Sequence, residues 1–320
     1  MKVLGLFFML ICTTLASALE LAPGLLYRQF TSKVGHNSAL EMHELRLSPE
    51  SPAQFGVFYN PGAHPNAACL QQYGGSNLPE LARSPELQNV LGVVNGIVFG
   101  PDQSGLGYLS HGMLLSQDKI FSPPQYLGAG VQSFVFWDAV GGVHTLRLRF
   151  SPCAAGGAHD LCGVEILEAT PELSLSESEL LAASKSAGEL VTAFQNIFPA
   201  LRAAFQSNME ISHGGEWSAC RPGAAAWKCQ SVPRTLLCLH QDGVVSFYTT
   251  GPALVHDLAM AFASDCHFLY NLDGGGSTQM GIRESGRPFQ MVDGRSITVT
   301  PARGCPSGYR PVEHYFGFSL

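Results

Sequence analysis

The chain is organised around one stretch, His267-Phe268-Leu269-Tyr270-Asn271-Leu272-Asp273-Gly274-Gly275-Gly276-Ser277-Thr278-Gln279-Met280. A short apolar run, long enough for a buried strand, ends in an aspartate and three glycines, and two hydroxyl residues follow. Consecutive glycines cannot pack a core, but they allow close backbone approach and present a concave row of N–H donors, as anion-holding loops do. The pattern favours a binding loop that displays Asp273 at the end of a strand. A plain glycine-rich turn, in which the aspartate is the first hydrogen-bonding residue, is the alternative.

Composition limits the partners of this protein. With 320 residues the chain is long enough for one large domain or two small ones, and 46% hydrophobic residues argue against disorder. Charged residues make up only 13% and the net charge is -7, so no basic field exists to hold nucleic acid or an anionic membrane. We therefore expect no nucleic-acid partner, and we expect any phosphate to be held by a few local donors.

The N-terminus has the pattern of a secretory signal. Lys2 supplies the positive charge, residues 4–15 the apolar segment, and Ala16-Ser17-Ala18 the cleavage site. The sequence predicts a signal peptide over 1–18, a mature chain that starts near Leu19, and a secreted or periplasmic location. An uncleaved anchor is the alternative. Because no later stretch reaches about 18 uninterrupted apolar residues, we expect no integral membrane association after cleavage.

Cysteine usage agrees with export. Apart from Cys12, the eight cysteines are Cys69, Cys153, Cys162, Cys220, Cys229, Cys238, Cys266 and Cys305. None forms the C-x-x-C spacing of a structural zinc site, and the sequence predicts no metal and no cofactor. Short turn-rich loops favour the disulfides Cys153–Cys162 and Cys220–Cys229. Cys238 and Cys266 lie in or beside apolar runs, where buried free thiols are the alternative.

Strand patterns dominate the rest of the chain. Alternating or apolar runs at 25–47, 54–60, 134–137 and 145–150 suit strands. Strands 235–239 and 244–248 are joined through Asp242-Gly243, a strong hairpin signal. Apolar spacing over 176–198, with a capping box from Ser176 to Glu179, predicts a helical segment. The sequence thus predicts one elaborated α+β domain over 19–320, with a mixed, largely antiparallel sheet and a few helices.

An Asn-Gly pair interrupts the apolar run at 93–99. Such a pair is usually a hairpin turn, but no balanced pair of strands flanks Asn95-Gly96. An exposed kink that presents the Asn95 amide is the competing interpretation. A further hairpin is expected at His111-Gly112.

The blocks at Pro233-Arg234-Thr235, Asp242-Gly243 and 271–277 resemble the signature of the phosphodiester glycosidase family, and Asn95-Gly96 resembles an earlier block of that family. The resemblance spans about 90–320 and is most specific in the last third. It implies a hydrolase of sugar-1-phosphodiester linkages. Because bacterial members are exported and often related to exopolysaccharide, it also implies a glycan substrate of the envelope or the extracellular space.

The chemistry of that substrate suggests a role for each residue. Arg234 suits bidentate capture of phosphate oxygens. An ionised Asp273 beside a phosphate would be repelled by roughly 1 to 4 kcal/mol at 4 Å. Asp273 is therefore better suited to accept a hydrogen bond from a sugar hydroxyl, or to act as an acid or base of raised pKa. Asn95 is suited to hydrogen-bond with sugar hydroxyls. We predict these three as catalytic, and we predict as substrate-binding Thr235, Gly274, Gly275, Gly276, Ser277, Thr278 and the second carboxylate Glu216.

Other interpretations stay open at this stage. Arg234 could be a surface ion-pair partner, His111 and His213 loop histidines, and Trp217 a partly buried residue rather than a stacking platform for sugar. A non-catalytic glycan-binding or envelope-assembly module is the competing class of function. A serine hydrolase is weaker, because Gly276-Ser277-Thr278 lacks the G-x-S-x-G elbow.

Overall fold

The computed structural model of the chain describes a defined set of residues: 18–59, 87–97, 99–101, 108–110, 112–116, 119–122, 130–153, 161–169, 176–184, 187–197, 200–207, 210–213, 216–217, 229–294, 296–297, 308–309, 312 and 314–320. The predicted signal segment, apart from its last residue, lies outside this set, and so does His111 of the predicted hairpin. Among the described residues, the helices are all too short or too polar to cross a membrane.

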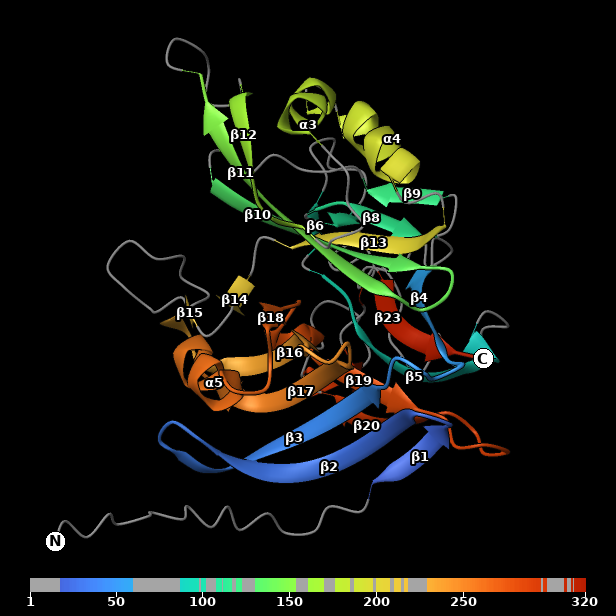
Figure 1. Cartoon of the computed structure of the whole chain (residues 1–320). Coiled ribbons are helices and arrows are strands. Elements are labelled where there is room, and N and C mark those ends of the chain that lie inside the picture. Colours follow the sequence, from blue (N-terminus) through green and yellow to red (C-terminus); the bar gives the residue numbers. More distant parts are fainter. Residues whose placement is uncertain are drawn as a thin grey trace, which may run out of the picture.

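Three large sheets make up the fold (Figure 1). The eight-stranded sheet has the order β1 (Leu19–Ala22), β2 (Leu25–Val34), β3 (Asn37–Leu47), β17 (Val245–Ala253), β16 (Val232–Leu239), β18 (Phe268–Asn271), β14 (Glu210–His213) and β15 (Glu216–Trp217). The six-stranded sheet has the order β12 (Leu161–Ala169), β11 (Val143–Pro152), β10 (Gly130–Asp138), β13 (Leu201–Ser207), β8 (Leu114–Ser116) and β9 (Lys119–Ser122). The five-stranded sheet has the order β20 (Gln290–Gly294), β19 (Gln279–Ile282), β5 (Val90–Asn95), β23 (His314–Ser319) and β4 (Gln54–Tyr59).

Two small ribbons complete the strands, β6 (Phe99–Pro101) with β7 (Tyr108–Ser110) and β21 (Ser296–Ile297) with β22 (Gly308–Tyr309). Every pairing between described strands is antiparallel. The predicted antiparallel character is confirmed. The expectation of a mixed sheet is wrong for this part of the chain, and strands outweigh helices more than the α+β label implies.

The predicted hairpin is the ribbon β16–β17. Gly243 has φ +81°, a conformation that glycine adopts at no steric cost. The turn is closed by the N–H of His240, which donates to the carbonyl of Val244 at 2.9 Å. Asp242 Oδ1 accepts the Val244 N–H at 3.2 Å. The Asp-Gly signal therefore predicted this turn correctly.

The predicted helical segment forms two helices, α3 (Glu177–Ala183) and α4 (Ala187–Ile197). The capping box at Ser176 is present, with the Ser176 hydroxyl accepting from the Glu179 N–H and the Glu179 carboxylate accepting from the Ser176 N–H. Both helices cover one face of the six-stranded sheet (Figure 1). Phe194 of α4 packs there on Phe134 and Phe136, with ring centroids 5.0 and 5.2 Å apart.

The other face of that sheet meets the two remaining sheets in a shared aromatic core. Phe55 of β4 stacks on Trp137 of β10 with ring centroids 3.9 Å apart, and it also lies 6.1 Å from Phe247 of β17. These rings come from the five-, six- and eight-stranded sheets in turn. Burial of such large apolar side chains is the main stabilising term available to the fold.

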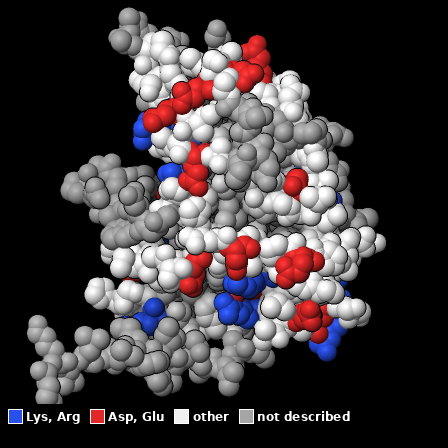
Figure 2. Space-filling view, viewed as in Figure 1, with Lys and Arg blue, Asp and Glu red and all other residues white. Residues whose placement is uncertain are grey.

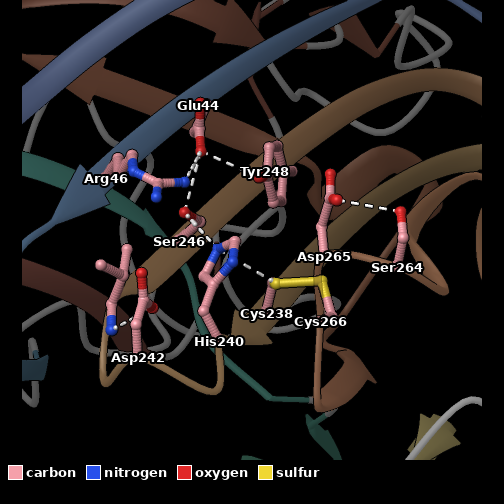
Figure 3. Close-up of a disulfide and its surroundings, with 11 residues drawn as sticks. Glu44, Arg46, Cys238, His240, Asp242, Ser246, Tyr248, Ser264, Asp265 and Cys266 are labelled. Carbon is pink, nitrogen blue, oxygen red and sulfur yellow. Dashed lines mark hydrogen bonds and ion pairs between the residues drawn. A yellow bond between two sulfur atoms is a disulfide. The ribbon is translucent and has the colours of Figure 1, made fainter.

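The far face of the eight-stranded sheet is covered by α5 (Val255–Phe262). Leu258 and Ala259 are completely buried against it. In the same buried cluster as the α5 side chains, Cys238 of β16 forms a disulfide with Cys266, with the Cα atoms 5.3 Å apart (Figure 3). The free-thiol alternative for this pair is therefore wrong.

The Cys153–Cys162 disulfide is confirmed, with the Cα atoms 4.8 Å apart. Cys229 takes part in a disulfide, but its predicted partner Cys220 lies outside the described residues, so that pairing stays a prediction.

Beside the Cys238–Cys266 disulfide a polar network is buried. Glu44 is fully buried, and its Oε1 accepts the hydroxyls of Ser246 and Tyr248, each at 2.8 Å. His240 lies between Ser246 and the disulfide (Figure 3), with Nε2 3.1 Å from Ser246 Oγ. Burial, and then the charge of Glu44, raises the pKa of Tyr248. The two bonds to Glu44 hold β3 against β17.

Candidate functional site

The glycine-rich stretch connects two sheets. It leaves the eight-stranded sheet at the end of β18, passes through the 3₁₀ turn η3 (Gly275–Ser277), and enters the five-stranded sheet as β19. Two backbone hydrogen bonds hold its start. The N–H of Leu272 donates to the carbonyl of Thr235 at 2.8 Å, and the N–H of Asp273 donates to the carbonyl of Gly96 at 2.9 Å. Segments far apart in the sequence thus meet at this loop.

Asn95 is the centre of this meeting point. Its side chain is completely buried, and Nδ2 donates to the Asp273 carbonyl at 2.7 Å. Oδ1 accepts the Thr235 hydroxyl at 2.6 Å and the Gln279 N–H at 3.0 Å. The exposed kink expected at Asn95 is therefore wrong. The hairpin is wrong as well, because β5 pairs with β19 and β23. Asn95 positions the loop by cross-linking it to β16 and β19.

There is no room for a side chain at Gly96, because a residue of another strand occupies that space. A Cβ atom at Gly96 would lie 2.2 Å from Cδ2 of His314, the first residue of β23. The His314 ring is buried, and its Nε2 accepts the Ile97 N–H at 3.0 Å. That bond assigns the proton of a neutral ring to Nδ1. Sequence reasoning missed His314, since only the pairing of the C-terminal strand brings it to Asn95-Gly96.

Arg234 is also buried, with 2% of its surface exposed. Its Nη1 donates to Asn271 Oδ1 at 3.3 Å and its Nη2 to the Gln230 carbonyl at 2.6 Å. Burial lowers the pKa of Arg234 to about 10. A surface ion pair, the alternative for this residue, is wrong. A desolvated guanidinium binds an oxyanion more strongly than an exposed one does, because less water must be displaced.

Arg234 and Thr235 belong to opposite faces of β16. Successive side chains of a strand alternate, and Thr235 reaches Asn95 while Arg234 reaches Asn271. A Cβ atom at Gly274 would lie 2.9 Å from the Pro233 carbonyl and 3.8 Å from Cδ of Arg234. Only glycine permits this approach, which places the loop directly against Arg234.

The loop itself presents donors and a carboxylate. Asp273 is half-buried, and its Oδ1 accepts the Gly274 N–H at 2.9 Å. Gly275 has φ +63°, and the space where its Cβ would be is open, so the backbone is accessible there. The hydroxyls of Ser277 and Thr278 are buried, and among the described residues neither has a hydrogen-bond partner. Buried groups of this kind are uncommon in proteins and require an explanation.

Glu216 is not brought to the loop. Its backbone pairs with His213, and His213 pairs with Phe268 at the start of β18. Asp273 follows Phe268 by five residues, or roughly 17 Å along an extended chain. Trp217 and His213 lie at that same distant end of the strand. The structure therefore unites Asn95, Thr235, Arg234 and the glycine loop, and it leaves Glu216 apart from them.

The charged side chains of the described residues are mixed on the face drawn in Figure 2. Acidic side chains follow its upper edge, and basic ones form small groups among acidic ones further down. The described residues of this face thus form no continuous basic surface. On this face, binding of a phosphate group would depend on local donors rather than on a basic surface.

Comparison with known proteins shows what part of this chain is similar to. The sequence model of the phosphodiester glycosidase family matches residues 170–318, which confirms the resemblance for this part of the chain. The match begins later than the expected residue 90. A search of the curated proteins finds no match.

Solved structures are similar over most of the chain. The zebrafish N-acetylglucosamine-1-phosphodiester alpha-N-acetylglucosaminidase catalytic domain, auto-inhibited by its pro-peptide, has a TM-score of 0.56 and 14% identity over 96% of this chain and 87% of its own. A hypothetical protein from Synechocystis has a TM-score of 0.54 and 13% identity, with 95% of this chain covered and 64% of that one. A Burkholderia pseudomallei protein described as exported has a TM-score of 0.51 and 13% identity, covering 90% and 76%. At such identities the likeness shows a shared fold.

Proposed function

Because residues 170–318 resemble phosphodiester glycosidases, we propose that this protein is an exported hydrolase. Its proposed substrate is a sugar-1-phosphodiester linkage of an envelope or extracellular glycan. The glycosidase-type fold and the family match support the reaction class. The disulfides Cys153–Cys162 and Cys238–Cys266 support an oxidising compartment, secreted or periplasmic.

The observation that carries the proposal is the contact network around Asn95. Its amide joins the Asp273 carbonyl, the Thr235 hydroxyl and the Gln279 N–H within 3.0 Å. A catalytic group has to be held within about 0.5 Å of its productive position. The three hydrogen bonds of Asn95, to Asp273 itself, to Thr235 of β16 and to Gln279 of β19, support such rigidity. In this proposal Asn95 and Thr235 position the loop through these hydrogen bonds and do not contact the substrate.

Arg234 and the loop amides are proposed to hold the phosphate. The aliphatic part of the Arg234 side chain lies close to Gly274, with Cδ 3.8 Å from where a Cβ of that glycine would be, and the backbone of Gly275 borders open space. The Ser277 and Thr278 hydroxyls supply two further donors that the described residues do not use. Together they offer charge-assisted and neutral hydrogen bonds to the same anion.

Asp273 is proposed to act at the sugar. In hydrolysis the bond from the anomeric carbon to the phosphate oxygen breaks, and a bond from that carbon to a water oxygen forms. A phosphate ester leaves as a stable anion, which Arg234 neutralises, so protonation of the leaving oxygen matters less than in ordinary glycosides. Asp273 then accepts the proton of the water or of a sugar hydroxyl. This division of roles needs only one carboxylate and assigns none to Glu216.

The test is release of sugar from a panel of activated sugar-1-phosphodiesters, with the N-acetylglucosamine compound first because the zebrafish relative carries that name. The wild-type chain is compared with Asp273→Asn, which keeps the shape and removes the charge. Release that falls at least about 100-fold in the variant supports the proposal. Binding of sugar-1-phosphate without release, equal in both proteins, would instead favour the glycan-binding module.

A further inference from the structure

A cluster of two histidines and one glutamate lies at the end of β18 that is remote from the glycine loop. Glu168 comes from β12 of the six-stranded sheet, His213 ends β14, and His267 directly precedes β18. One ligand-type atom from each residue lies within 4.8 Å of the others. The two imidazole rings are 5.2 Å apart between centroids and steeply inclined. The cluster therefore connects two sheets at a single point.

Both oxygens of Glu168 face imidazole nitrogens. His267 Nε2 lies 3.1 Å from Oε1, and His213 Nε2 directly contacts Oε2. The second contact lies outside hydrogen-bond geometry, and the His267 Nδ1 atom is buried with no partner among the described residues. In a neutral histidine with its proton on Nδ1, Nε2 is an electron-pair donor, as a carboxylate oxygen is. In that tautomer both Nε2 atoms and the two Glu168 oxygens present lone pairs to one another, and a bound cation would satisfy all of them.

We propose that Glu168, His213 and His267 bind a divalent transition-metal ion, with Zn²⁺ the best match. Two imidazoles and one carboxylate suit zinc, which bonds to their atoms at about 2.0 to 2.2 Å. Ligand atoms of a tetrahedral site then lie about 3.3 to 3.5 Å from one another. Side-chain movements of about 1 Å bring this cluster to that geometry, well within the reach of rotamer adjustment.

An approach path and a fourth position are available. Glu168 and His267 line a cavity of about 280 Å³ together with Thr145, Phe268 and residues of the β16–β17 turn. Between 25% and 32% of each ligand side chain is exposed, so an ion reaches the cluster from solvent. Three protein ligands leave one tetrahedral position, which water from the cavity fills.

The metal binds both sheets at once. Nearby, Arg147 of β11 makes a two-pronged ion pair with Glu210 of β14, at 3.0 and 2.9 Å, and spans the same two sheets. A metal at the cluster adds a second connection at the His213 end of β14. Sequence reasoning predicts no metal site, because the three ligands come from separate segments and none forms a short ligand motif.

The test uses the purified full chain after treatment with a chelator and dialysis. Zn²⁺ titration by calorimetry is expected to show one ion per chain with micromolar or tighter affinity, and saturation is expected to raise the Tm. Co²⁺ in the same site is expected to give visible d–d absorption. Glu168→Gln, His213→Ala and His267→Ala should each weaken Zn²⁺ binding at least about 100-fold, because even outer-shell partners are typically worth 10- to 100-fold.

His144→Gln is the matched control. His144 Nε2 also contacts a carboxylate oxygen, that of Asp138 at 3.0 Å, but it lies outside the cluster, so Zn²⁺ affinity should not change. X-ray absorption of the wild-type zinc complex keeps the proposal testable if a variant fails to fold, and it is expected to show two imidazole ligands and no sulfur. No stoichiometric binding, sulfur in the coordination shell, or equal affinity in all four variants would each overturn the proposal.

Discussion

The hydroxyl of Thr235 donates to Oδ1 of Asn95 at 2.6 Å, across the boundary between the eight-stranded and five-stranded sheets. Both residues are completely buried. Thr235 lies on the strand that also carries Arg234, and Asn95 holds the carbonyl of Asp273. These two bonds together connect the proposed phosphate-binding strand to the proposed catalytic loop. Loss of either bond should lower both the stability and the activity of the protein.

Replacing Asn95 by alanine leaves the Thr235 hydroxyl and the Gln279 N–H buried without their acceptor. Each such group costs about 1 to 3 kcal/mol, so urea unfolding should show a loss of at least about 2 kcal/mol. Thr235→Val should cost about 1 to 3 kcal/mol, whereas Thr235→Ser keeps the hydroxyl and should retain most of the stability. Equal stabilities of the valine and serine variants would show that the hydroxyl bond contributes nothing.

Substitution of Gly96 by alanine should strain the fold through His314. The new Cβ would lie 2.2 Å from the imidazole ring, and a buried ring on a central strand cannot move away freely. We expect a loss of about 1 to 3 kcal/mol in urea unfolding. Gly163→Ala is the control, because its Cβ would meet only the Ser151 side chain at ordinary contact distance, 3.5 Å.

A double-mutant cycle identifies the source of that strain. His314→Ala removes the ring that Gly96→Ala would meet. The double variant should then lose less stability than the sum of the two single losses, since the clash is absent. Strict additivity would place the effect of Gly96→Ala elsewhere.

Loss of Arg234 should weaken phosphodiester recognition. A charge-assisted contact contributes about 1.5 to 3 kcal/mol, so Arg234→Ala should lower affinity for a sugar-1-phosphate by roughly 10- to 150-fold. Arg234→Lys should restore only part of this, because the forked geometry is lost. Unchanged affinity in both variants would remove Arg234 from the site.

The pH dependence of catalysis offers an independent check on Arg234. Burial lowers the pKa of its guanidinium to about 10. The charged form that binds phosphate is thus present below about pH 10 and lost above it. We expect kcat/KM to fall above that pH, while the limb for kcat lies higher because bound phosphate favours the charged form. A flat kcat/KM profile up to pH 11 would contradict this assignment.

The two described disulfides should differ in their effect on stability. Cys238–Cys266 closes a loop of 28 residues and Cys153–Cys162 one of 9. Loop-closure entropy gives about 3.6 kcal/mol for the longer loop and about 2.6 kcal/mol for the shorter. Thermal unfolding of the paired serine variants should therefore show the larger loss for Cys238→Ser with Cys266→Ser. A larger loss for the shorter loop would indicate that local packing dominates instead.

Local signals in the sequence determined several parts of this protein. The Asp242-Gly243 turn, the capping box at Ser176 and the Cys153–Cys162 loop depend on residues within ten positions of one another. Turn chemistry, caps and short disulfide loops are local physics, so their sequence patterns predict them. The antiparallel character follows from the same hairpin signals. The block from Asp273 to Thr278 was also recognisable from the local sequence as a loop, because three consecutive glycines cannot pack in a core.

Tertiary structure alone decided what surrounds that block. The sequence predicts a turn or an exposed kink at Asn95, but pairing of β5 with β19 and β23 buries its amide among three segments. His314 reaches Gly96 from the far end of the chain, and Glu168 reaches His213 and His267 from another sheet. Glu216 is carried away from Asp273 by the register of β14 and β15. Sheet order and register arise from burial of apolar faces over the whole chain. The sequence of a single segment therefore does not show which strands it pairs with.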